Sequence, residues 1–310
     1  MPIHECPESA WGNARALDDS ECHVVVVRLS RAQRDRGAVK QIRPSFDRPP
    51  LVEQAIVIVF EPLHGFSIVD YGLFWQEIRA EFPLVESTDP TPEQTEVFDE
   101  VRTPETRLQL FQTLPLPRAM FRDEAGGELV QLQPDRFGFN WSKVEEKHYP
   151  RSEHVMARFE DLFAKFRAYV EARGIGPVKI KQCELTNLNI IPVRDFGSGY
   201  EDMTRALRVD PLDLGIPFLQ AETYIRARQH RILDGDNTPV GRLHTEITPV
   251  VSTQDGEKAF RLEITARSRP GITTLEEMRS FFDLGRNSIN AAFCATVTDQ
   301  MRKHWGEHDA

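Results

Sequence analysis

Pro134-Asp135 and the downstream triplet Glu145-Glu146-Lys147 match the loose pattern of acids and lysine found in metal-dependent nucleases. In that chemistry, the carboxylates of Asp135 and Glu145 hold Mg²⁺, and Lys147 positions the attacking water beside a phosphodiester. The pattern needs the triplet on a strand, whereas residues 142–148 are expected to form the loop before a helix. Pro134-Asp135 is also sufficient as a turn. A metal-dependent nuclease therefore stays as the alternative hypothesis.

Arginine and histidine recur at alternate positions of three strand candidates in the second half of the chain. Alternate residues of a strand share one face, so we expect these side chains to line a single open face of a sheet. The face would bind an anion, a nucleic acid or an acidic protein. The competing interpretation is a solvated face whose arginines pair with neighbouring glutamates. The residues concerned are Tyr224, Arg226, Arg228, His230, Arg242, His244, Arg261 and Arg267.

Other catalytic and metal-binding patterns fail on spacing. His244-Thr245-Glu246 resembles half of a zinc deaminase site, but the second cysteine motif of those enzymes does not follow. The chain has no phosphate-binding loop, no dinucleotide-binding glycine motif and no G-x-S-x-G. Its four cysteines include no C-x-x-C pair. We therefore expect no metal, no cofactor and no catalytic residues beyond the nuclease alternative.

Composition restricts the class of protein further. The 310 residues are 40% hydrophobic, which supports one large or two small folded domains, and 38 basic against 48 acidic residues give a net charge of −10. An acidic chain of this kind is not a general nucleic-acid coat. No apolar run approaches the roughly 18 residues that span a bilayer, and the first residues lack a signal-peptide pattern. We expect no membrane association and a cytoplasmic location.

The first half of the chain is expected to follow an N-terminal extension, residues 1–48. Residues 51–60 are β-branched and nearly uncharged, as in a central strand, and residues 68–82 show helical spacing. Seven acids among residues 86–107 indicate a solvated loop. The long apolar stripe of residues 151–173 predicts a helix. Between them, turn residues separate three strand candidates, 116–122, 128–133 and 136–141.

The second half repeats this order of elements. A long strand over residues 178–193 is followed by three strand candidates, joined by Asp-Gly turns. Thr274 and Glu277 have capping-box spacing and open the first of two closing helices, which we expect Gly285 to separate. The three strand candidates are 218–232, 240–251 and 258–267.

The order of elements predicts an α+β fold with a curved antiparallel sheet covered on one side by long helices. Two similar halves, 49–176 and 177–310, would each contain a strand, a helix or loop, three strands and a long helix. Whether the two halves share one sheet is left open. A small-ligand pocket under the curved sheet is a third functional possibility, although the sequence names no ligand.

Three segments also carry a resemblance to a known family: residues 48–60, the stretch QLQPDRF-G-F-NW with Tyr149-Pro150-Arg151, and residues 287–305. Together they resemble a sporadically distributed, functionally uncharacterised bacterial protein family, over residues 48 to about 305. The resemblance implies an accessory gene, such as one for defence, toxin control or a mobile element. The motif residues that are candidates for a specific role are Gln131, Gln133, Asp135, Arg136, Asn140 and Trp141, of which Arg136, Asn140 and Trp141 are taken as binding residues. Phe137, Phe139 and Trp141 alternate, however, and so also fit a core strand.

Our first hypothesis is a non-catalytic binding or adaptor protein of an accessory bacterial system. It would present a polar sheet face, or the groove between its two halves, to a protein partner. Nucleic acid remains a possible partner under the nuclease alternative, and the oligomeric state is left open.

Overall fold

The computed structural model describes residues 42–92, 94–98, 115–144, 149–209 and 222–308. All of them belong to one compact unit of the chain. The expected N-terminal extension lies outside these residues up to position 41. Its described end forms strand β1 (Ser45–Phe46), which pairs with β11 (Glu307–His308) close to the C-terminus.

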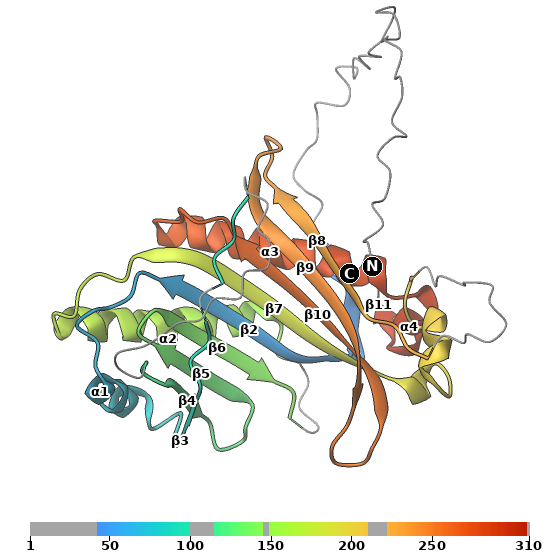
Figure 1. Ribbon diagram of the computed structural model, residues 1–310, viewed down its shortest axis with the longest axis horizontal. Coiled ribbons are helices and arrows are strands. Elements are labelled where there is room, and N and C mark those ends of the chain that lie inside the picture. The colour runs from blue at the N-terminus through green and yellow to red at the C-terminus, as the bar shows by residue number, and fades with distance from the viewer. Residues whose placement is uncertain (1–41, 93, 99–114, 145–148, 210–221, 309–310) are drawn as a thin grey trace, which may run out of the picture. The chain divides into compact units, whose positions relative to one another are not determined.

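The fold is mixed α+β and is built on a nine-stranded sheet with the order β3-β4-β5-β6-β2-β7-β10-β9-β8 (Figure 1). Each of its strand pairs is antiparallel, as the sequence predicts, and β2 and β7 join both halves of the chain into this sheet. The strands are β2 (Leu51–Phe60), β3 (Leu84–Thr88), β4 (Arg118–Arg122), β5 (Glu128–Gln133), β6 (Arg136–Ser142), β7 (Ile180–Pro192), β8 (Arg226–Leu233), β9 (Pro239–Val251) and β10 (Lys258–Ser268).

The two long helices cover one face of the sheet. In Figure 1, α2 (Ser152–Ala172) and α3 (Leu275–Thr296) both lie behind the strands. Phe137 of β6 stacks on Phe166 of α2 at 5.2 Å between ring centroids and also contacts Phe163 at 5.5 Å. We call this the helix-covered face. Strand register places Ile56, Ile58, Phe137, Leu185, Leu262 and Ile264 on it.

Helix α1 (Ile68–Ile78) adds a further layer beside α2. Phe74 of α1 meets Phe166 of α2 edge to face at 5.4 Å. Asp70 is buried and accepts hydrogen bonds from the backbone N–H of Ser67 and from the hydroxyl of Tyr169 on α2, both shorter than 3 Å. These bonds, the Ser67 hydroxyl and Arg173 outweigh burial and lower the pKa of Asp70. The carboxylate therefore fixes α1 to α2.

The closing helices differ from the prediction at one glycine. The capping box of Thr274 and Glu277 opens α3 as expected, but Gly285 lies inside α3 and does not separate two helices. A Cβ at position 285 would lie 3.2 Å from the Cβ of Ala266 on β10, so glycine here allows α3 to approach the sheet closely. The chain leaves the helix at Val297, and α4 (Asp299–His304) follows.

The acid-rich stretch 86–107 is not simply a solvated loop. Its first residues complete β3, which pairs with β4, and Glu96 and Phe98 are buried. Residues 99–107 lie outside the described part of the chain. Composition alone misassigned the described part because the partners of Glu96 come from strands far along the chain.

Across the described residues, no helix has the length and apolar character needed to cross a membrane.

Candidate binding face

The face of the sheet opposite the helices is polar. Register places Arg231, Arg242, Arg267 and Glu184 directly beside one another on β8, β9, β10 and β7. We call this side the polar face. Directly opposed like charges destabilise an antiparallel pair, so this arginine row requires acidic neighbours.

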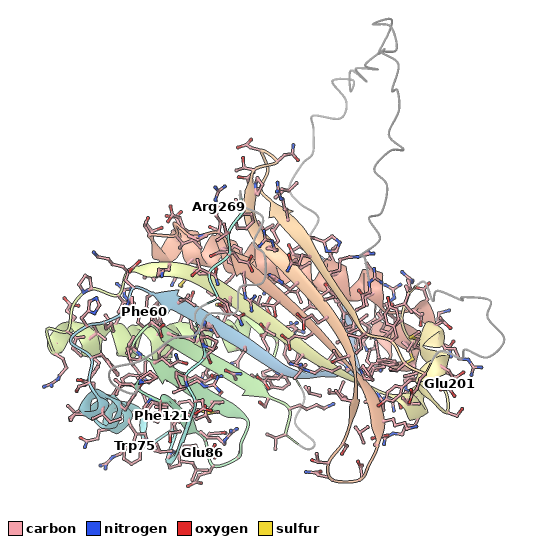
Figure 2. All side chains as sticks on the ribbon, viewed as in Figure 1. Phe60, Trp75, Glu86, Phe121, Glu201 and Arg269 are labelled. Carbon is pink, nitrogen blue, oxygen red and sulfur yellow. The ribbon has the colours of Figure 1, made fainter. Side chains whose placement is uncertain are left out.

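One extended segment crosses the polar face. It consists of residues 89–92 and 94–98, which follow β3, and we call it the strap. In Figure 1 the strap is the teal segment that passes in front of the sheet, on the side away from α2 and α3. In Figure 2, Glu86 marks its starting edge and Arg269 marks the end of β10 where it arrives.

Two glutamine side chains hold the backbone of the strap. The side-chain oxygen of Gln133 on β5 accepts from the N–H of Thr91 at 2.9 Å, and its amide nitrogen donates to the Thr91 carbonyl at 3.2 Å. Gln182 on β7 accepts from the N–H of Glu96 at 2.9 Å and donates to the carbonyl of Gln94 at 3.0 Å. Each amide thus satisfies both a donor and an acceptor of an extended chain, as a neighbouring strand would.

The carboxylate of Glu96 enters a site made of three basic side chains. One oxygen accepts from Arg242, and the other lies 2.6 Å from Nε2 of His244 and 3.6 Å from a guanidinium nitrogen of Arg267. The Glu96 side chain is 7% exposed. Burial would raise the pKa of Glu96, but the hydrogen bond and charge of His244 and the charges of Arg242 and Arg267 outweigh it, so this pKa is lowered. The site is therefore built for an ionised carboxylate.

The end of the strap is held by the same arginine. Arg242 donates to the carbonyl of Val97 at 3.0 Å, and its guanidinium lies 4.7 Å from the ring centroid of Phe98. Arg269 covers that ring at 5.6 Å. Arg242 therefore contacts an acid, a backbone carbonyl and an aromatic ring in three successive residues, using its planar and multiply donating guanidinium.

On the polar face of the first half, side-chain amides form a hydrogen-bonded network. Asn140 on β6 accepts from Gln131 at 2.7 Å and donates to Glu53 on β2. Arg136 is buried and lies 3.5 Å from Glu184 of β7. The two motif residues Arg136 and Asn140 are thus on the polar face and are engaged within the protein.

The prediction that the basic side chains of all three strands line one face is wrong for β8. Arg226, Arg228 and His230 are opposite Ile247, Thr245 and Leu243, which places them on the side of the helix-covered face. Gln229 and Arg231 are the β8 residues that share the polar face with His244 and Arg242. The alternation was correct, but β8 is exposed on both sides at the sheet edge, so its sequence did not reveal which face was which.

The remaining predicted binding residues are dispersed. Tyr224 precedes β8 and packs partly against the core. Trp141 is buried on the helix-covered face and meets Tyr149 at 5.0 Å. Arg261 is on the polar face but pairs with Glu263 two residues further along β10. Within the predicted set, Arg242, His244 and Arg267 converge on Glu96, and Arg136 and Arg267 converge on Glu184.

The nuclease residues are only partly described. Asp135 lies in the turn between β5 and β6, where its carbonyl accepts from the N–H of Phe60 at 2.9 Å. Glu145 and Lys147 fall outside the described residues. Within the described part of the chain, no group of three or more His, Cys, Asp and Glu side chains could hold a metal ion.

A separate cavity of about 370 Å³ opens where β2 begins and β7 ends, away from the strap. Its lining includes Arg48, Lys143, Arg194 and His304, together with Trp305. This is not the pocket between helices and sheet that the third possibility requires, since phenylalanine rings fill that space.

Sequence reasoning missed Glu96 and Gln182, and it selected Gln133 only as a residue of the shared motif, without its contact to Thr91. Glu96 stood among seven acids that gave no reason to select one. The available signal was the pattern Gln94-Thr-Glu96-Val-Phe98, in which polar and apolar residues alternate within an acidic stretch, as in an extended segment lying on a surface.

No protein-family model matches the chain, and no curated protein matches it. The resemblance to a bacterial family therefore stays a prediction.

Proposed function

We propose that this chain is a non-catalytic binding protein that takes up an extended segment of a protein partner on the polar face of its sheet. One observation carries the proposal. The polar face already accommodates an extended segment, its own strap, through two backbone-binding glutamines and a carboxylate site. Backbone contacts of this kind are typical of surfaces that recognise extended peptides.

The charge of the face favours a protein over a nucleic acid. Arg242, Arg267 and His244 converge on a carboxylate, while Glu184 lies directly beside Arg267, at 3.7 Å. An acid inside the arginine row lowers the net positive charge of the face, and positive charge is what binds a phosphate backbone. The amide side chains of Gln133 and Gln182 suit peptide groups in either direction.

The wider setting follows from the family resemblance. It places the protein in an accessory bacterial system for defence, toxin control or a mobile element, acting in the cytoplasm. The two described cysteines, Cys183 and Cys294, are free thiols, as is common in a reducing compartment.

We also propose that the two halves of the sheet are copies of one unit. Apart from β3, which is an extra strand at one edge, the strand order is symmetric about the central pair β2 and β7, with β6, β5 and β4 on one side matching β10, β9 and β8 on the other. The last of the three hairpin strands in each half is followed by a long helix, α2 or α3. In this arrangement the carboxylate site belongs to the second copy and the Gln133 contact belongs to the first.

A capture experiment tests the function. The tagged full chain is compared with an R242E/R267E variant in lysate of the native host, with and without nuclease treatment. We expect a stoichiometric protein that survives nuclease and is lost in the variant, because the reversed charges repel an acidic segment.

An R261E variant is the matched control, since Arg261 lies on β10 and on the same face but pairs with Glu263, outside the carboxylate site. Its partner should be retained. The proposal fails if the captured species is nucleic acid, or if R261E and R242E/R267E lose the partner equally.

A further inference from the structure

The arginine row has more positive charge than the strap neutralises. Glu96 contacts Arg242 and Arg267, and Glu184 contacts Arg267 and Arg136. Arg231, directly opposite Arg242, is exposed and has no acidic partner among the described residues. Arg231 and Arg242 are like charges directly opposite one another, an arrangement that destabilises an antiparallel pair unless an acid lies nearby.

The strap is held mainly by contacts that another chain can reproduce. Its backbone is bound through glutamine amides, its acid through guanidinium and imidazole groups, and only Phe98 contributes a buried ring. Pro92 and Gln94 are exposed, although the side-chain oxygen of Gln94 accepts a hydrogen bond from Arg267 at 2.8 Å. Net contributions of such hydrogen bonds are small because water competes for the same groups.

We propose that the Arg242–His244–Arg267 site is the recognition site for a glutamate or aspartate of the partner's extended segment, and that the strap occupies it in the absence of the partner. This inference rests on the proposed function and names the chemistry of the partner. The segment carries an acid followed two residues later by an aromatic side chain, as Glu96 and Phe98 are spaced. Strap and partner therefore compete for one site.

A second acid in the segment would satisfy Arg231. The side chains of Arg231 and Arg242 share a face on neighbouring strands, so an acid flanking the first reaches Arg231. The expected partner segment is more acidic than the strap at this end of the face. The strap is tethered and therefore present at high effective concentration, and the additional acid helps the partner segment to compete with it.

The test uses a fluorescent peptide with the sequence of residues 89–98, and full-length protein in which the strap is weakened by E96Q. Fluorescence anisotropy measures binding. We expect E96Q to bind the peptide at least about tenfold more tightly than the unsubstituted protein, because the internal competitor has lost its charge. Changing the glutamate of the peptide that corresponds to Glu96 to glutamine should abolish this gain, and so should R242A/R267A in the E96Q background.

E86Q is the matched control. It removes the same charge from β3, where Glu86 lies 3.8 Å from Arg122 and outside the strap, and should bind the peptide as the unsubstituted protein does. F98A provides a second way to weaken the strap if E96Q fails to fold, as judged by circular dichroism. It should raise peptide affinity in the same direction.

Equal affinity of E96Q, F98A and unsubstituted protein for the peptide overturns the inference. Tighter binding of a single-stranded oligonucleotide than of the peptide to E96Q also overturns it. A captured partner that depends on Arg242 and Arg267 but does not compete with the peptide would leave the proposed function standing and remove only this inference.

Discussion

On the face covered by α2 and α3, the sheet packs against interlocked phenylalanine rings, whereas on the opposite face it contacts one extended segment through amides, guanidinium groups and an imidazole. Phe137 and Arg136 are adjacent on β6 and point to these two environments. Both side chains are buried, but for different reasons.

The two faces differ in whether their contacts can be replaced by contacts with water or with another chain. When the packing opens, the rings on the helix-covered face lose contacts that nothing replaces, because water cannot replace dispersion and hydrophobic contacts. Hydrogen bonds of the strap are exchanged for bonds to water or to another chain at small net cost. One face therefore maintains the fold, and the other is suited to replacing one extended ligand with another.

The largest effect is expected on the helix-covered face. F137A removes a fully buried ring that contacts Phe74, Phe159, Phe163 and Phe166. We expect a loss of about 3–5 kcal/mol in the free energy of unfolding, measured by urea denaturation. A loss below about 1 kcal/mol would contradict the assignment of this face as the main source of stability.

Replacing one glycine by alanine on each face adds one methyl group to that face and compares how tightly the two faces are packed. At Gly241, on the helix-covered face, a Cβ would lie 2.7 Å from the carbonyl oxygen of Arg267 and 2.8 Å from Cε2 of Phe281. At Gly138, on the polar face, the nearest atom is Cγ2 of Val57 at 3.3 Å. We expect G241A to cost about 1–3 kcal/mol and G138A less, because overpacking a rigid core forces side chains and backbone to shift.

Thermal denaturation of both variants checks the order. Equal costs would show that the polar face is packed as tightly as the helix-covered one and would weaken the distinction between them.

Loss of the strap's charge should have a smaller effect on global stability. E96Q is expected to reduce the free energy of unfolding by about 1 kcal/mol, since the arginines regain water when the carboxylate is removed. Hydrogen exchange of residues 94–98 should increase while the amides of β2 and β7 stay protected. Loss of protection across the whole sheet would mean that the strap is an integral part of the core.

The elements that the sequence predicted well are those whose signals are local. The residues that form the apolar stripe of α2 are close together in the sequence, and so are Thr274 and Glu277 of the capping box. The structure confirms the helix that the first pattern predicts and the helix start that the second predicts. The turn at Asp123–Gly127 likewise located the hairpin of β4 and β5.

The candidate site depends on non-local pairing, so the sequence predicts only part of it. Arg242, His244 and Arg267 were chosen correctly as one face, but their ligand Glu96 is 146 residues from Arg242 along the chain. For β8, alternation identified two sets of side chains without showing which set faces the strap, because edge exposure removes the apolar side as a guide. The sequence predicts a helix stop at Gly285, whereas the structure places this glycine inside α3, where it packs closely on Ala266.

The smallest expected effect is the pH dependence of the strap. The pKa of Glu96 is lowered from its ordinary value of 4.5 by His244, Arg242 and Arg267. A group with a depressed pKa in the folded state stabilises that state above its unfolded pKa, and this contribution disappears as the pH falls through the folded value. The stability difference between unsubstituted protein and E96Q should therefore be constant at neutral pH and shrink below the ordinary glutamate range. Urea denaturation of both proteins over a pH series measures it. If the difference instead grew on acidification, the carboxylate of Glu96 would be bound in its protonated form, and the polar face would not be a site for ionised acids.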